Sequence, residues 1–203
     1  IGPIVVSILE SEEPFKSAFT IERAGQLVYA QEIEGALAFP ETGTPLQDFN
    51  RDGTPDLVLG YFTGGAHCCF RYKLLSLENP VKELFEIASE HSELQLDDGD
   101  GDGIEEFYLD DWTFAYWGAP FADSVAEPIV LEIKNGALSL ADELMRRPAL
   151  SRAEWEDRVK DVRAQWADHQ RIQTLSTFQD GEWGPAPVLV WATMLDLIYT
   201  GNG

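Results

Sequence analysis

Two copies of one acidic pattern constrain this chain more than any other feature of its sequence. Residues 48–56 (DFNRDGTPD) and 98–106 (DGDGDGIEE) both read D-x-[DN]-x-D-G-x-x-[DE], and each is followed directly by an apolar run. The match extends outward, since Leu46 before the first copy corresponds to Leu96 before the second. We interpret the pair as an internal repeat of a loop and the strand that follows it.

The residue types in this loop predict a calcium site. Oxygen side chains at positions 1, 3 and 5, a glycine bend at position 6, an inward carbonyl at position 7 and a carboxylate at position 9 can enclose a hard cation. The expected ligands of the first loop are Asp48, Asn50, Asp52, the carbonyl of Thr54 and Asp56. Those of the second loop are Asp98, Asp100, Asp102, the carbonyl of Ile104 and Glu106. We therefore expect two calcium ions, with the second loop binding more strongly because it has four carboxylates against three.

The loops are not EF-hands. An EF-hand closes with a bidentate glutamate at position 12, where this chain has Leu59 and Leu109. Asp/Gly-rich turns also occur without a ligand, but two copies in register favour a cation. Without one the clustered carboxylates repel each other, so binding should be coupled to folding.

The composition excludes several classes of protein. Thirty-six acidic against 14 basic residues give a net charge of −22, which argues against nucleic-acid binding and against docking on anionic membranes. A hydrophobic fraction of 44% argues against a disordered acidic tail. No apolar run reaches the roughly 18 residues that span a bilayer, so we expect no membrane insertion.

The pattern of short apolar runs predicts an α+β fold. Strands are expected at residues 4–9, 18–22, 27–33, 57–62, 69–77, 84–88, 106–109 and 129–133, separated by Gly, Pro and Asp clusters. We divide the chain into a β-rich calcium-binding region, 1–135, and a helical region, 136–203, packed on it as one structural unit. The β-rich region should form blade-like antiparallel hairpins but not a complete propeller, which needs at least four blades.

Three helices are expected after residue 135. Ser139 with Asp142 predicts a short helix that Pro148 stops, and Ser151 with Glu154 predicts the capping box of a second helix. This second helix has an apolar stripe, which predicts that it is amphipathic and packed on the rest of the chain. The stripe consists of Trp155, Val159, Val162 and Trp166. Residues 185–200 are apolar on nearly every side, which predicts a buried core helix with Gly201 at the position just after its end.

The first loop and its strand resemble the calcium loops of FG-GAP/VCBS-type repeats, found in integrin α-subunit propellers and many exported bacterial proteins. The following segment, GGAHCC at residues 64–69, resembles a group of uncharacterised exported bacterial proteins that pair such loops with this segment. The resemblance covers residues 46–112. It implies β-blade-like hairpins, structural calcium and an extracytoplasmic setting, and it implies no reaction.

The adjacent cysteines, Cys68 and Cys69, leave three interpretations open. In an oxidising compartment they can close a vicinal disulfide. They can also be two small buried thiols. With His67 they can form a soft-metal site for copper or zinc, although neighbouring residues of a strand point to opposite faces and chelate poorly.

The remaining candidate site is a carboxylate and aromatic cluster. Motif searches find no nucleophile elbow, no HExxH, no P-loop and no dinucleotide fingerprint. Side chains that could bind or cleave a sugar are Asp110, Asp111, Trp112 and Trp117. The plainer interpretation is that the aspartates complete a strand end and the aromatic rings fill the core.

These observations favour a non-enzymatic, calcium-stabilised binding or structural module whose ligand is a protein or a carbohydrate. One alternative is a glycan-acting hydrolase or lyase with a cleft at residues 110–117. Another is a soft-metal or redox protein that uses His67, Cys68 and Cys69. Cytosolic calcium is too scarce to fill weak sites, so a periplasmic or secreted location is expected. Residues 1–9 lack the features of a signal peptide, and we expect that any signal peptide has already been removed from this chain.

Overall fold

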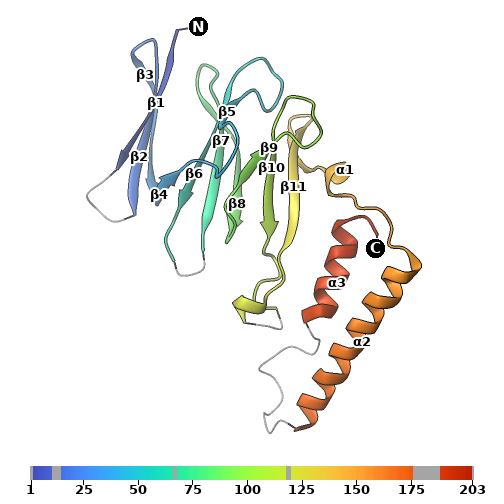
Figure 1. Ribbon diagram of the computed structural model, residues 1–203. Helices are drawn as coiled ribbons and strands as arrows, with labels where there is room; N and C mark the ends of the chain where they lie inside the picture. Colours follow the sequence, from blue (N-terminus) through green and yellow to red (C-terminus); the bar gives the residue numbers. More distant parts are fainter. Residues whose placement is uncertain (1, 11–14, 66–67, 118–119, 176–187, 203) are drawn as a thin grey trace. The chain divides into compact units, whose positions relative to one another are not determined.

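The computed structural model describes residues 2–10, 15–65, 68–117, 120–175 and 188–202, and only the backbone of residues 10 and 171–175. The fold is mostly antiparallel β-sheet with a few helices, in agreement with the predicted α+β class (Figure 1). Among the described strands no closed barrel is formed.

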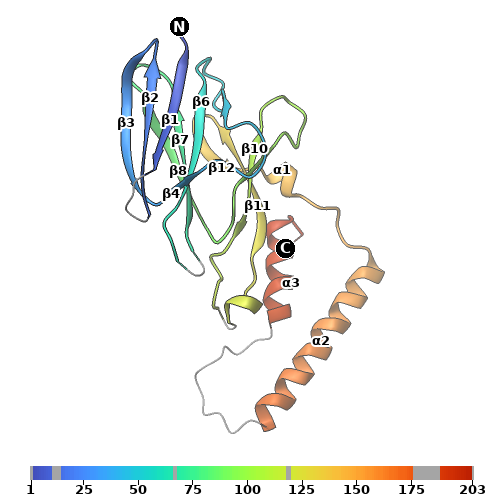
Figure 2. The same ribbon diagram turned by 60° about the vertical axis from the view of Figure 1, so that its left-hand side comes forward.

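The strands belong to three sheets (Figures 1 and 2). The first sheet contains β1 (Ile4–Glu10), β2 (Lys16–Arg23) and β3 (Gln26–Glu34), in that order. The second has the order β4-β6-β7-β8 and contains β4 (Ala36–Ala38), β6 (Asp56–Phe62), β7 (Phe70–Ser76) and β8 (Lys82–Glu90), with β5 (Leu46–Gln47) paired to β6. The third has the order β12-β11-β10-β9 and contains β9 (Gln95–Asp97), β10 (Glu106–Asp111), β11 (Glu127–Lys134) and β12 (Ala137–Leu140).

The chain divides into two compact units. The first consists of Ile1–Leu109 and Val130–Leu140 and contains both acidic loops. The second consists of Asp110–Ile129 and Ala141–Gly203 and contains the helices.

The core of the first unit lies between the first and second sheets. In β2 the side chains alternate, so that Phe19 and Ile21 are fully buried while their neighbours are less so. They join one hydrophobic cluster with Leu57 and Leu59 of β6. Because β6 is buried along most of its length, it fixes where the loop that precedes it ends.

All eight predicted strands are confirmed, and the described residues contain four further strands that were not predicted. The four are short, and they are β4, β5, β9 and β12. The predicted cap at Ser139 is wrong, because Ser139 lies in β12 opposite Glu132. The short helix α1 (Asp142–Met145) instead follows Ala141, which makes no side-chain cap.

The caps of the longer helices are confirmed. At the start of α2 (Arg152–Leu175), the backbone N–H of Ser151 donates to Glu154 at 2.7 Å, and the backbone N–H of Glu154 donates to the Ser151 hydroxyl at 3.4 Å. Helix α3 (Val188–Tyr199) ends with Gly201 at φ +73°. There the N–H of Asn202 donates to the Leu197 carbonyl at 2.7 Å, as in a Schellman motif.

The predicted burial of these two helices is wrong in part. The stripe of α2 is largely uncovered, with Trp155, Val159 and Trp166 at 37, 38 and 40% exposure. In α3 only Leu195 is buried among its described residues, whereas Ile198 is exposed. The predicted start of this helix, at residues 185–187, lies outside the described residues, and none of the described helices is both long and apolar enough to cross a membrane.

Candidate metal centres

The two acidic loops share most of their internal hydrogen bonds, position by position. The carboxylate at position 1 accepts from the backbone N–H groups of positions 5 and 6. These bonds are Asp52 to Asp48 at 3.0 Å, Gly53 to Asp48 at 2.8 Å, Asp102 to Asp98 at 3.0 Å and Gly103 to Asp98 at 3.0 Å. The predicted repeat is therefore also a repeat in structure.

The other ligand positions agree equally well. Position 3 accepts from the N–H of position 5, through Asn50 at 2.9 Å and Asp100 at 3.0 Å. Position 5 accepts from the N–H of position 7, from Thr54 to Asp52 at 2.8 Å and from Ile104 to Asp102 at 2.9 Å. Position 9 accepts from the N–H of position 2, from Phe49 to Asp56 at 3.1 Å and from Gly99 to Glu106 at 2.9 Å.

The backbone explains why glycine stands at position 6. Gly53 and Gly103 have φ angles of +87° and +90°, in the left-handed region that an L side chain seldom adopts. This bend turns both halves of the loop toward one centre. Position 4 is also left-handed, with Gly101 at +77° in the second loop and Arg51 at +61° in the first.

In the second loop four carboxylates converge. One oxygen from each of Asp98, Asp100, Asp102 and Glu106 lies within 4.8 Å of the others. Calcium binds oxygen at about 2.3–2.6 Å. Two ligand oxygens on opposite sides of one ion are therefore about twice that distance apart, which is close to the 4.8 Å limit found here. Burial and the charges of the three aspartates raise the pKa of Glu106, which is the response of a carboxyl group held among like charges without a cation.

In the first loop the closing carboxylate is completely buried. Asp56 is 0% exposed, and its Oδ1 forms no hydrogen bond within the described residues; the hydroxyl of its cross-strand neighbour Ser76 lies near the carboxylate but outside hydrogen-bond geometry. Burial raises the pKa of Asp56 to about 6, against the lowering effects of the Asn50 N–H and the Ser76 hydroxyl. A buried carboxylate oxygen without a partner is costly, and a bound cation would satisfy it.

The two loops contact each other directly. The guanidinium of Arg51, at position 4 of the first loop, forms an ion pair with Asp102 of the second loop. Gln47 donates to the carbonyl of Gly103 at 3.0 Å and accepts from the N–H of Glu105 at 2.9 Å. These contacts were not predicted from the sequence, because the two loops were treated separately. The outward extension of the repeat was the signal that the two loops are equivalent, neighbouring units.

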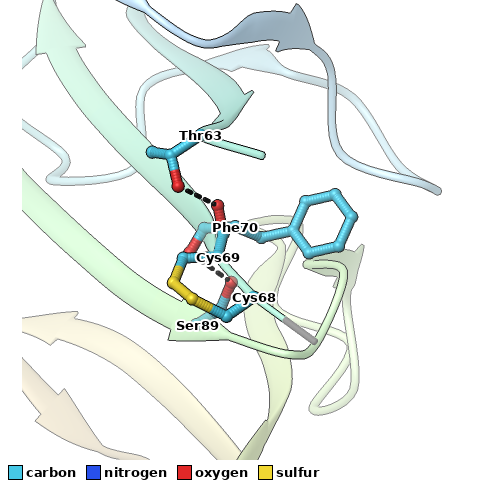
Figure 3. The surroundings of a disulfide bond; sticks show 5 residues. All are labelled: Thr63, Cys68, Cys69, Phe70 and Ser89. Atoms are coloured by element: carbon cyan, nitrogen blue, oxygen red, sulfur yellow. Dashed lines mark hydrogen bonds between the residues drawn. A yellow bond between two sulfur atoms is a disulfide. The ribbon is translucent and has the colours of Figure 1, made fainter. Parts of the chain in front are cut away.

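The cysteines form a vicinal disulfide between Cys68 and Cys69 (Figure 3). The Cys69 carbonyl accepts from the backbone N–H of Thr63 at 3.1 Å, which closes the turn between β6 and β7. Sulfurs bonded to each other supply no thiolates for a soft metal, so copper or zinc binding here would require reduction of the bridge. A carboxylate oxygen of Glu90 lies within 4.8 Å of both sulfurs, and His67 lies outside the described residues.

Reducing this disulfide should barely change the global stability of the protein. The bridge joins neighbouring residues, so it removes almost no loop-closure entropy from the unfolded chain. We expect a shift of the melting temperature of about 2 °C or less, since 1 kcal/mol corresponds to roughly 2–4 °C at this size. Melting with and without reductant measures the shift, and thiol counting on the denatured, unreduced protein should find no free thiol. Two free thiols per chain would contradict the bridge.

The carboxylate and aromatic cluster lies in the second unit. Asp111 accepts from the Thr113 backbone N–H at 2.9 Å and from the Tyr199 hydroxyl at 2.5 Å. Although burial acts in the opposite direction, the bonds from Thr113 and Tyr199 hold the pKa of Asp111 below its usual range. The burial of Tyr199 and its bond to Asp111 raise the Tyr199 pKa to about 12. Asp111 is thus a structural acceptor that binds Tyr199 of α3 within the second unit.

The aromatic rings near Asp111 pack mainly on each other. Trp112 stacks on Phe121, with ring centroids 5.0 Å apart. The ring centroid of Trp117 lies 4.3 Å from that of Trp191 and 5.3 Å from that of Phe114, and Trp117 is 53% exposed. Asp110 is half-buried at the end of the same strand. This arrangement agrees with the plainer interpretation of these side chains.

Comparison with known proteins adds no relationship: no protein-family model, no curated protein and no solved structure matches this chain.

Proposed function

We propose that this protein is a calcium-stabilised, non-enzymatic binding or structural module that works outside the cytoplasm. The observation that carries the proposal is the convergence of Asp98, Asp100, Asp102 and Glu106 in a loop whose hydrogen bonds are repeated in the first loop. Each loop would hold one calcium ion, with the ligands at positions 1, 3, 5, 7 and 9.

The buried carboxylate of Asp56 supports the first site independently. Its Oδ1 lies at the end of the loop, where β6 begins, and forms no hydrogen bond within the described residues. Calcium at this point would compensate for that cost and would pin the loop to the buried strand.

Two properties of the chain support the proposed extracytoplasmic setting. Loops built from exposed carboxylates, like those of extracellular calcium modules, bind weakly and need the higher calcium concentration outside the cytoplasm. A vicinal disulfide also persists more readily in an oxidising compartment.

Terbium luminescence tests the second site. A Cβ added at Gly99 would lie 1.9 Å from the Tyr108 hydroxyl, so this phenol lies directly against the second loop. Tyr108 should sensitise the emission of Tb³⁺ bound in place of calcium, and added calcium should quench that emission. Tyr108→Phe should lower the emission far more than Tyr29→Phe, which changes a tyrosine of the first sheet, and Asp102→Ala should abolish the component sensitised by Tyr108. Emission that calcium cannot displace would overturn the assignment.

Removing the charge of Arg51 should tighten the second site. The guanidinium neutralises Asp102 and would repel a cation bound there. Arg51→Gly gives the first loop the residue that the second loop has at this position, so its left-handed backbone is retained. We expect calcium affinity at the second loop to rise about two- to fivefold, with a smaller effect at high salt. Calcium titration measures the affinity of the second loop, and Arg51→Lys is the control that keeps the charge. Weaker calcium binding by Arg51→Gly would contradict the prediction and show that Arg51 orients Asp102.

A further inference from the structure

Helix α2 carries an apolar stripe that the described part of the chain leaves largely open. Trp155, Val159, Val162 and Trp166 follow each other at spacings of 4, 3 and 4 residues, which is the seam of an antiparallel or parallel coiled coil. Three of the four are 37 to 40% exposed, an unusual exposure for two tryptophans and a valine on one helix face.

Helix α3 lies beside α2 (Figure 1) and forms polar contacts with it on one flank of the stripe. On that flank Arg158 forms an ion pair with Asp196, and Gln165 accepts from the backbone N–H of Leu189 at 3.0 Å. Between the two helices an open groove of about 250 Å³ runs along the stripe, and Arg158 is one of its lining residues. Its apolar lining includes Trp155, Val159, Val162, Val190 and Met194.

The charge of α2 differs sharply from that of the whole chain. The helix has five basic and five acidic side chains and is therefore neutral, while the chain carries −22. The basic residues are Arg152, Arg158, Lys160, Arg163 and Arg171, which is five of the 14 in the whole chain. Two copies of this acidic protein would repel each other over most of their surface, but not along α2.

We propose that the groove binds α2 of a second copy of this chain, with the two α2 helices antiparallel. The stripe sets the register: Trp155 lies at the level of Trp166 of the second copy, and Val159 at the level of Val162. In this register Glu156 faces Arg163 of the second copy, and by symmetry the contact occurs twice. With both α3 helices included, the result is a four-helix bundle.

A parallel pair is disfavoured by the same side chains. It would place Arg158 beside Arg163 of the second copy, also twice, and like charges in those positions oppose pairing. Arg158 is moreover already bound to Asp196 on the flank that contacts α3. Charge therefore selects the antiparallel dimer.

Charge exchange on the full chain tests the proposal. Sedimentation equilibrium or light scattering should give twice the chain mass of 22.7 kDa at micromolar concentration. Glu156→Arg and Arg163→Glu should each weaken dimerisation about tenfold, because each replaces two attractive contacts with two repulsive ones. The double variant should restore dimerisation, which no general effect on folding would produce. Lys160→Glu, outside the stripe on the same helix, is the control and should leave the mass unchanged.

Spin labels on cysteines introduced into α2 test the direction. In the antiparallel register two copies of position 161 lie at nearly the same level, whereas two copies of position 152 are separated along the axis by about 25 Å. The spin–spin distance should therefore be clearly longer for Arg152→Cys than for Asp161→Cys, whereas equal distances would indicate a parallel pair and overturn the register. A mass of one chain up to about 100 µM, or a dimer that survives both single charge reversals, would overturn the proposal.

Discussion

Asp56→Asn should stabilise this protein in the absence of calcium and lose that advantage when calcium is present. In chelator at pH 7 we expect the variant to be more stable than the wild type, because the amide removes a buried charge whose Oδ1 has no partner. The pKa of about 6 against an ordinary value near 4 corresponds to roughly 2–3 kcal/mol, or a melting temperature several degrees higher. In millimolar calcium this advantage should disappear, since the variant loses a charged ligand and with it the roughly 2.7 kcal/mol that an ion at 100 times its dissociation constant would contribute.

The pH dependence gives the same prediction a second readout. The native state of the calcium-free protein binds a proton at Asp56 between pH 4 and about 6 that the unfolded state does not bind. Its stability should therefore rise as the pH falls from 7 to 5, and Asp56→Asn should lack that part of the rise. Melting curves in chelator across this range measure it.

Asp52→Asn is the matched control for Asp56→Asn. Asp52 lies in the same loop but is exposed, and the hydrogen bond from the Thr54 N–H lowers its pKa. The control should lose stabilisation by calcium without gaining stability in chelator. If Asp56→Asn also lost stability in chelator, the carboxylate would be satisfied without a cation, and the argument for the first site would fail.

Chelating calcium should lower the melting temperature of the wild-type protein substantially. An ion at 100 times its dissociation constant stabilises the native state by about 2.7 kcal/mol, so two such sites give about 5 kcal/mol. At this chain length that corresponds to roughly 10–20 °C. Melting curves in calcium and in chelator, both in 0.15 M salt, measure the difference. Magnesium at the same concentration is the control. Because magnesium prefers octahedral sites and retains bound water, it should stabilise the protein far less than calcium does.

Superimposable melting curves in calcium and chelator would contradict this prediction. Equal effects of calcium and magnesium would also contradict it, because they would indicate general screening of the −22 charge in place of specific sites.

The strands and the loops could be predicted because their determinants are local. Alternating or continuous apolar runs bounded by turn residues predicted strands such as β6 and β7. The glycines at positions 6 and the acidic spacing predicted the backbone bend and the converging side chains of the loops. Short strands such as β5, with two residues, are too brief to show a period.

The features that sequence reasoning missed depend on partners distant in the chain. Ser139 has the local signature of a cap, but pairing with Glu132 in the third sheet takes precedence over it. The contact of Arg51 with Asp102 spans 51 residues and has no local signature. The stripe of α2 predicts an apolar partner, and a helix pattern cannot specify whether that partner belongs to the same chain or to another.

Calorimetric titration of the chelator-treated protein with calcium tests the central claim most directly. The proposal predicts two ions bound per chain, with the second loop the tighter site. It predicts one ion in Asp56→Asn, one in Asp102→Ala and none in the double variant. A wild-type chain that binds no calcium, or single variants that still bind two ions, would contradict the assignment of the loops as calcium sites.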